Sequence, residues 1–211
     1  TVDTDTEAVE YVISDGANPD VTGTLSGLHG SGSFSGGDDA SGLDEGAVDL
    51  TVTAVDDAGN SSGTDGTDSA TKDTVRPTAP TISAFGEDRS GTNYITIANV
   101  GSVPLSGTIS MDTDAVDYTI SDGGSDVTGT ITGRLGTGTF SITEDLSGLS
   151  QGSVDAAVTA VDVAGNSSGT DATDSATKDT VRPTTPTVSV FGEDRSGTNY
   201  INIANQASVP L

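Results

Sequence analysis

Carboxylates recur at the ends of predicted strands, on the side of the strand that faces the core. Asp56 continues the parity of the apolar positions in residues 48–54, and Asp162 does the same after residues 154–160. A buried or half-buried carboxylate needs a partner. The chain has only seven Lys and Arg against 32 Asp and Glu, so basic side chains are too few to pair with these carboxylates. We therefore expect the partner to be a hard cation that binds oxygen ligands.

The linkers that follow these turns offer further oxygen donors. Asp73 and Asp179 lie in Pro-flanked linkers and could approach the same junctions between repeats. Calcium takes six to eight oxygen ligands, which Asp carboxylates, Asn amides and main-chain carbonyls of turns supply. We therefore predict a Ca²⁺ site at each junction, with ligands drawn from Asp56, Asp57, Asn60, Asp73, Asp162, Asn166 and Asp179.

Some of these residues also have a simpler, structural interpretation. Asn60 and Asn166 end tight Ala-Gly-Asn turns, where Asn tolerates a left-handed backbone and caps its own turn. That role alone would explain them. Both also begin an Asn-Ser-Ser glycosylation sequon, a match that is common by chance. Most other acids, Asp112 and Asp114 among them, are expected to be solvated.

The composition excludes several classes of function. A formal net charge of −25 at pH 7 would repel nucleic acid. The absence of Cys and the single His exclude disulfides, thiolate zinc sites and His clusters. No apolar run approaches the roughly 18 residues that span a membrane, and no signal-peptide pattern opens the chain. The acids lie on predicted turns and wet faces without a unique constellation, so we expect no enzyme.

The hydrophobic pattern indicates short strands and no long helix. Apolar and polar residues alternate over 48–54 and 154–160, and again over 9–13 and 116–120, as in half-buried strands. Only residues 146–149 resemble a short helical turn. Further strands are predicted at 81–85, 94–97, 103–110, 127–135, 137–142 and 170–177.

The chain repeats itself with a period of about 106 residues. Residues 61–99 and 167–205 agree at 34 of 39 positions, and the eight aromatic residues form four matched pairs at nearly the same offset. Seven or eight short strands per period favour an all-β fold of tandem immunoglobulin-like β-sandwich repeats. We predict the carboxy-terminal part of one repeat at 1–75, a complete repeat at 76–182 and the amino-terminal part of a following repeat at 183–211.

Two forms of assembly are compatible with a complete repeat that is flanked by two partial ones. The chain is either a segment of a much longer repetitive protein or a subunit that polymerises head to tail. In the second case, residues 183–211 of one subunit would complete residues 1–75 of the next by strand exchange. Both predict a linear assembly, in which the partners are neighbouring repeats or further copies of the chain.

Three motifs carry a resemblance to a known family. VDDAGNSSGT at 55–64, TKDTVRPTAPT at 71–81 and IANVGSVPLSGT at 97–108 resemble the bacterial Ig-like repeats of very large cell-surface adhesins of the biofilm-associated type. The resemblance implies extracellular spacer domains that are stiffened by calcium at their junctions. The sequence departs from the family in the insertion EDRSGTN at 87–93 and 193–199, to which we assign no purpose.

These patterns favour a structural extender, the stalk of an extracellular adhesin or surface fibre. The alternative is a self-assembling filament or surface-layer subunit. A carbohydrate-binding module is a weaker alternative, because exposed aromatic residues for sugar stacking are not evident. Repulsion between acidic neighbours would extend an array at low salt, and each repeat would add about 35 to 45 Å of length.

Overall fold

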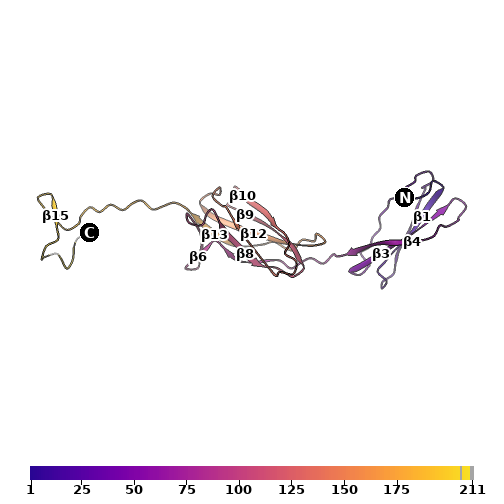
Figure 1. Ribbon diagram of the computed structural model, residues 1–211, viewed down its shortest axis with the longest axis horizontal. Helices are drawn as coiled ribbons and strands as arrows, with labels where there is room; N and C mark the ends of the chain where they lie inside the picture. The colour runs from indigo at the N-terminus through magenta and orange to yellow at the C-terminus, as the bar shows by residue number, and fades with distance from the viewer. Residues whose placement is uncertain (205, 210–211) are drawn as a thin grey trace.

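The chain folds as separate all-β units arranged along one long axis (Figure 1). The computed structural model describes residues 1–204 and 206–209. These two ranges contain no helix, and therefore no helix that is long and apolar enough to cross a membrane. Residues 146–149, predicted as a helical turn, form a tight turn in which Leu149 N donates to Leu146 O at 3.2 Å.

The central unit, which we call the sandwich domain, consists of two packed sheets. Its strands are β5 Thr81–Phe85, β6 Glu87–Arg89, β7 Thr92–Thr96, β8 Val103–Thr108, β9 Thr113–Ser121, β10 Asp126–Ile131, β11 Thr139–Glu144, β12 Gly152–Asp162 and β13 Asp171–Asp179. The smaller sheet has the order β11-β8-β5, and the larger has the order β10-β9-β12-β13-β7-β6. Neighbours are antiparallel except β13 and β7, which run parallel. This is the predicted all-β, immunoglobulin-like arrangement.

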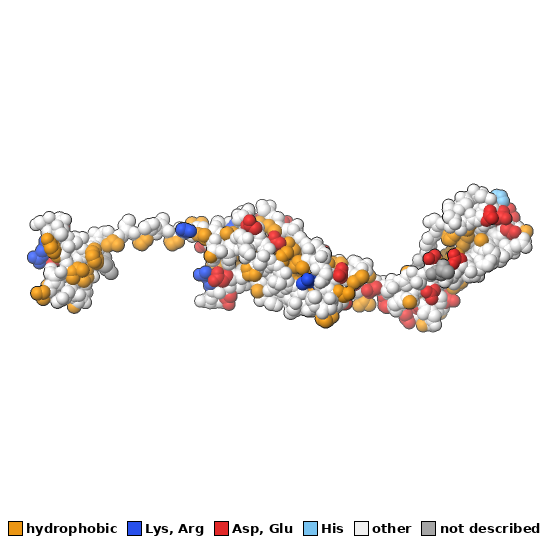
Figure 2. Space-filling view, viewed as in Figure 1, with side chains coloured by type: hydrophobic (Ala, Val, Ile, Leu, Met, Phe, Trp, Pro, Cys, Tyr) orange, Lys and Arg blue, Asp and Glu red, His pale blue; other side chains and the backbone are white. Residues whose placement is uncertain are grey.

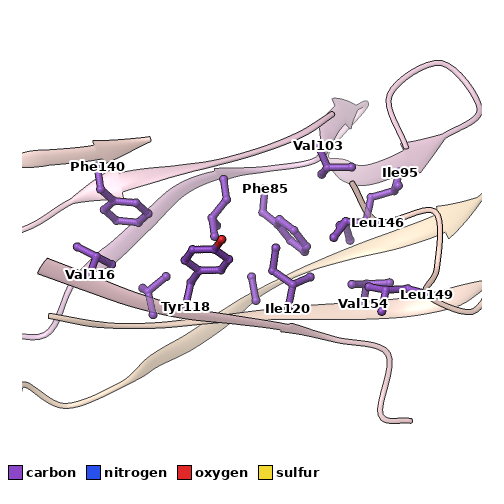
Figure 3. Packing of buried hydrophobic residues seen from close by; sticks show 14 of the residues in the cluster. Phe85, Ile95, Val103, Val116, Tyr118, Ile120, Phe140, Leu146, Leu149 and Val154 are labelled. Atoms are coloured by element: carbon purple, nitrogen blue, oxygen red, sulfur yellow. The ribbon is translucent and has the colours of Figure 1, made fainter. Parts of the chain in front are cut away.

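The core of the sandwich domain lies between its two sheets (Figure 3). Phe85 and Phe140 on the smaller sheet belong to one cluster with Tyr118 and Ile120 on the larger sheet. The alternate apolar residues of 154–160 on β12 are each 0% exposed. The predicted alternation of this strand is therefore confirmed. Phe85, Tyr118 and Phe140 serve as core anchors, whereas Tyr94 is only half-buried.

The insertion at 87–93 forms a β-hairpin at the edge of the larger sheet. β6 pairs with β7, and β7 pairs with β13 through Tyr94 beside Thr177. The turn has Ser90 at φ 58° and Gly91 at φ 85°, the two consecutive left-handed residues of the tight hairpin turn that suits twisted strands. The insertion thus adds two short strands, one of which places Ile95 in the core with no exposed surface.

The amino-terminal unit is a single four-stranded sheet. Its strands are β1 Thr6–Ser14, β2 Val21–Ser26, β3 Gly46–Asp56 and β4 Asp65–Lys72. Their order, β2-β1-β3-β4, matches the order β10-β9-β12-β13 of the sandwich domain. Residues 33–38, which align with β11, form no strand. No strand among residues 1–204 and 206–209 pairs with them.

The carboxy-terminal segment contains one hairpin, formed by β14 Glu193–Arg195 and β15 Thr198–Tyr200. It repeats the β6–β7 hairpin, including the left-handed pair Ser196 and Gly197. Residues 187–191, which align with β5, form no strand. Among residues 1–204 and 206–209, β14 and β15 pair only with each other.

Some predicted strand limits were wrong. The strand expected at 127–135 ends at Ile131, because the chain turns at residues 134–137, where Thr137 N donates to Arg134 O at 2.9 Å. The strand expected at 137–142 begins at Thr139 and ends at Glu144. In both cases, the sheet partner rather than the local alternation decides where the strand stops.

Candidate inter-repeat junction

The tip of β12 carries a turn that is closed by a buried carboxylate. Asp162 is 7% exposed and accepts hydrogen bonds from Asn166 N at 2.8 Å and from Asn166 Nδ2 at 2.9 Å. The main chains of the two residues also bond, with Asp162 N donating to Asn166 O at 3.1 Å. Burial opposes ionisation of Asp162, but the hydrogen bonds from Asn166 outweigh it and hold the pKa of the carboxyl below its usual value.

The residue with left-handed backbone in this turn is the glycine and not the asparagine. Gly165 has φ 91°, and Gly59 in the equivalent turn has φ 82°. Asn60 and Asn166 are not among the non-glycine residues of positive φ in the described part of the chain. The expectation of a left-handed Asn was therefore wrong. The expectation that Asn caps its own turn is confirmed by the side-chain bonds to the preceding Asp.

The equivalent turn at the tip of β3 is built in the same way. Asn60 N and Nδ2 donate to the Asp56 carboxylate at 2.7 and 2.8 Å. These bonds, that of the Asn60 side chain foremost, lower the pKa of Asp56. Asp57 lies outside this bonding pattern, with its carboxylate 3.4 Å from Nδ1 of His29 and both side chains more than half exposed. The local sequence therefore reproduces the turn in both units.

The linker between the amino-terminal unit and the sandwich domain forms hydrogen bonds with both of them. Thr74 N and Oγ1 donate to the two carboxylate oxygens of Glu45, at 2.7 and 2.5 Å. One residue earlier, the main-chain oxygen of Asp73 accepts from Asn166 Nδ2 at 3.0 Å. Asp73 thus bonds to the sandwich domain, and Thr74, the next residue, bonds to the amino-terminal unit. This bond brings the predicted ligands Asp73 and Asn166 together across the joint and, through the turn, Asp162.

The linker that leaves the sandwich domain starts in the same way. Thr180 N donates to Oε1 of Gln151 at 2.9 Å, and Gln151 Nε2 donates to Oγ1 of Thr180 at 2.6 Å. Gln151 therefore takes the place of Glu45. The carboxylate of Asp179 accepts only from Val181 N among the bonds described, at 3.0 Å, as that of Asp73 does from Val75 N at 3.1 Å.

The seven predicted ligands lie in three separate places. Asp56 ends β3, whereas β4 runs back and brings Lys72 beside Gly46, so Asp56 and Asp73 lie at opposite ends of the amino-terminal unit. Asp57 and Asn60 stay near Asp56, and Asp179 stands at the exit of the sandwich domain. Within residues 1–204 and 206–209, no three His, Cys, Asp or Glu side chains are grouped as a metal site would need.

The junction nevertheless offers donors of the right type for calcium. Asp73 and Asp162 bring carboxylates, Asn166 an amide oxygen, and the linker its main-chain carbonyls. Both carboxylate oxygens of Asp162 already accept bonds within the turn. A bound cation would therefore share the turn with these bonds and take further oxygens from water.

Sequence reasoning missed the two lysines, which are the only ones in the chain. Lys178 is 3% exposed, and its Nζ donates to the carbonyl oxygens of Leu146, Ser147 and Leu149. Lys72 donates in the same manner to Leu43 O at 2.7 Å and to Glu45 at 3.2 Å. Their scarcity and their spacing of one repeat were the available signal.

The acids at the other strand tips brace loops. Asp122 accepts from Ser150 N, and Asp15 accepts from Asp44 N, at 2.5 and 2.6 Å. For Asp122 the main-chain bond from Ser150 is the largest of the effects that hold its pKa far below the usual value, and for Asp15 the largest is the side-chain bond from Asn18. Each carboxylate thus links two loops, and its oxygens already accept hydrogen bonds that hold these loops in place.

The chain is similar to several proteins of known structure. No family model matches the chain, and no curated protein does. A tetra-tandem repeat from the extending region of a large adhesion protein is 26% identical, with a TM-score of 0.40 over 82% of this chain and 42% of that one. A Ca²⁺-stabilized adhesin with which an Antarctic bacterium binds ice is 25% identical, with a TM-score of 0.42 over 86% of this chain and 42% of that one.

A third match is the fibronectin(III)-like modules of CbhA from Clostridium thermocellum, at 18% identity and a TM-score of 0.43 over 85% of this chain and 82% of that one. The chain spans less than half the length of the two adhesin structures. The chain is thus similar to tandem Ig-like repeats of large bacterial adhesins, including the extending region of one of them.

Proposed function

We propose that the chain is a structural extender, a part of the stalk of an extracellular adhesin or surface fibre, divided into repeats at 1–75, 76–182 and 183–211. The observation that supports this best is the linker bonded on both sides, by Glu45 from one unit and by Asn166 from the next. Such a joint sets the direction from one unit to the following one, which is what a spacer must do.

The acids are used for structure rather than for chemistry. Asp56 and Asp162 close turns, while Asp15 and Asp122 tie loops together. Acidic side chains also lie over the surface of the amino-terminal unit and beside the linker (Figure 2). These arrangements support a non-enzymatic stalk at the cell surface, where mutual repulsion keeps neighbouring repeats apart.

We further propose that Ca²⁺ stiffens each junction. At the joint described here, Asp73, Asp162 and Asn166 would hold the ion; Asp56, Asp57 and Asn60 would serve a joint at the other end of the amino-terminal unit, and Asp179 a joint beyond the sandwich domain. The oxygen donors support this, and so does the Ca²⁺-stabilized adhesin to which the chain is similar. Bound calcium would neutralise acids that otherwise repel one another across the joint.

The calcium proposal is tested by melting and small-angle scattering of the chain in Ca²⁺ and in EDTA. We expect Ca²⁺ to raise the Tm and to narrow the distribution of particle lengths. Asp73→Asn should reduce both effects, whereas Asp126→Asn, which removes the same charge from an exposed residue at the other end of the domain, should leave them intact. Equal curves in Ca²⁺ and EDTA would exclude the ion.

A second candidate function is a filament or surface-layer subunit that polymerises head to tail. The observation that favours it is the apolar face of the amino-terminal unit, together with the exposed apolar residues of the carboxy-terminal segment.

A further inference from the structure

The larger sheet of the sandwich domain has two unlike edges. One edge is β6, whose three residues Glu87, Asp88 and Arg89 are all charged and exposed. The other edge is β10, which has six residues and a single charge, at Asp126. Short, charged edge strands resist pairing with another chain, whereas longer, uncharged ones accept it. Among the residues that the structure describes, β10 pairs only with β9, so the sheet is open to a partner on this side.

The sequence of β10 is complementary to itself in an antiparallel pair. Two copies that pair about Gly129 place Thr128 of one copy opposite Thr130 of the other, on the outer face of the sheet. On the core face, Val127 of one copy lies opposite Ile131 of the other. Thr pairs and pairs of β-branched apolar residues stabilise neighbouring strands, and the residue that faces itself has no side chain.

The apolar residues of β10 also gain cover from such a pair. Val127 and Ile131 pack against the core but are only half-buried, because no strand lies on their outer side among the described residues. A second copy of β10 would add a strand there and shield both side chains from water. Burial of apolar surface favours the contact.

The amino-terminal unit has the same edge. β2 is the last strand of its sheet, and residues 20–24 are identical to residues 126–130. The wider segments 22–50 and 128–156 agree at only 15 of 29 positions, and β11 agrees with its counterpart 33–38 at two of six. Thr22 and Thr24 are exposed, as Thr128 and Thr130 are. Packing within one chain does not require exposed residues to be identical, whereas a contact made by this edge does.

We infer that β10 is a docking edge for β10 of a second copy of this chain. The two larger sheets join into one continuous sheet by strand addition, in the antiparallel register centred on Gly129. Both copies contribute the same surface, so the contact has two-fold symmetry and is complete with two strands.

The symmetry sets the direction of the two chains. The strands of the sandwich domain run roughly along the long axis of the chain (Figure 1). Two chains that pair through antiparallel β10 strands therefore lie side by side and point in opposite directions. For the stalk proposed above, this is the arrangement of two stalks that project from facing surfaces, and the contact adds a lateral partner to the stalk role.

The acidity of the chain opposes this contact at low salt. Each copy carries a formal charge of −25, so two copies repel each other. At the edge itself the repulsion is small, because Asp126 of one copy faces Thr132 of the other. At 1 M salt the screening length falls to about 3 Å. Association should therefore become stronger with salt, the opposite of what a contact held by ion pairs would show.

The first test is analytical ultracentrifugation of the chain in EDTA, over a range of protein and NaCl concentrations. We expect the mass to rise above the 20.9 kDa of one chain, and to rise further in 1 M NaCl. Thr22→Asp combined with Thr128→Asp places a carboxylate on both edges and should keep the chain monomeric. The matched control, Ala47→Asp combined with Ser153→Asp, adds the same charges at exposed positions of the inner strands β3 and β12. It should associate as the parent chain does.

The second test measures the register by cross-linking, because the chain has no Cys of its own. Chains with Thr128→Cys and chains with Thr130→Cys are oxidised separately and as a mixture. In the inferred register the two changed positions face each other at about 5 Å, whereas two copies of the same position lie about 8 Å apart, too far for a disulfide. The mixture should therefore form disulfide-linked dimers several-fold faster than either chain alone.

Three results would overturn the inference. They are a parent chain that stays monomeric at every protein and salt concentration, a variant with both edges changed that associates as the parent does, and a mixture that cross-links no faster than its components. The edge contact uses no cation and is measured in EDTA. Its failure would leave the stalk and calcium proposals standing, and a stalk without calcium would leave the edge contact standing.

Discussion

Asn166 donates from one side-chain nitrogen to two partners, the carboxylate of Asp162 in its own turn and the main-chain oxygen of Asp73 across the joint, at 2.9 and 3.0 Å. A single amide thereby couples the tip of β12 to the linker that arrives from the preceding unit. Because Glu45 binds the next linker residue, Thr74, the two units are connected through a fixed piece of main chain.

Asn166→Ala should loosen this joint. The substitution removes the bond across the joint as well as the cap of the turn, at a cost of about 1 kcal/mol to the unfolding free energy of the sandwich domain. Two dye labels, one on each unit, should show a broader distance distribution in single-molecule energy transfer.

Asn60→Ala is the matched control for that variant. Asn60 closes the same kind of turn on Asp56, at the end of the amino-terminal unit that is far from Asp73. It should weaken its own turn by a similar amount and leave the distance distribution unchanged. A joint that loosens equally in both variants would contradict the role of the bond to Asp73.

Lys178→Met should destabilise the sandwich domain. The methionine keeps the length of the apolar stem, but the carbonyl oxygens of Leu146, Ser147 and Leu149 lose their buried donor, which costs about 1 to 3 kcal/mol. Denaturant unfolding measures the loss. Lysine acylation followed by mass spectrometry is a second check, because Lys178 should react more slowly than the less buried Lys72.

Gly91→Val should destabilise the β6–β7 hairpin. Gly91 has φ 85°, a left-handed conformation that costs a residue with a branched side chain about 1 to 2 kcal/mol. Because β7 buries Ile95 against the core, this loss should lower the Tm of the sandwich domain. Gly197→Val makes the same change in the β14–β15 hairpin, where φ is 81°, and should leave that Tm unchanged.

Alkaline pH should destabilise the sandwich domain through Tyr118. Burial, followed by the hydrogen bond that its hydroxyl donates to Glu144 at 2.5 Å, raises the pKa of Tyr118 to about 12. The pKa in the folded state lies above the unfolded value of about 10. The stabilisation is therefore fully present below pH 10 and is lost as the pH rises from about 10 through about 12.

Tyr118→Phe provides the control for this pH dependence. It keeps the ring in the core and removes the ionisable hydroxyl, so the fall in stability over that pH window should become smaller. Absorbance of the phenolate in the parent chain should show one tyrosine that ionises only near pH 12. A fall of equal size in the variant would assign the alkaline instability to other groups.

Local alternation predicted β3 and β12 well, because a half-buried strand records its two faces directly in the sequence. A strand was predicted at 94–97 and overlaps β7, but the β6–β7 hairpin was not predicted. Its strands of three and five residues are largely polar, and they exist because β7 pairs with the edge of β13. This pairing joins segments about 80 residues apart, so neither segment by itself indicates its partner.

The contacts of the candidate junction were also predicted only in part. The turns that join Asp56 to Asn60 and Asp162 to Asn166 follow from residues four apart, so their spacing revealed them. Glu45 contacts Thr74 at a separation of 29 residues, and neither residue stands out in the sequence. The fold alone brings that carboxylate to the linker.

The sequence by itself determined the all-β repeat, the parity of its longest strands and the turns at their tips, since these depend on residues only a few positions apart. The tertiary structure decided which of these strands are covered. Residues 81–97 and 187–203 are nearly identical, yet residues 81–85 form β5 and their counterparts 187–191 form no strand. β5 pairs with β8, and a strand forms where another strand satisfies its main-chain bonds and a second sheet covers its apolar face.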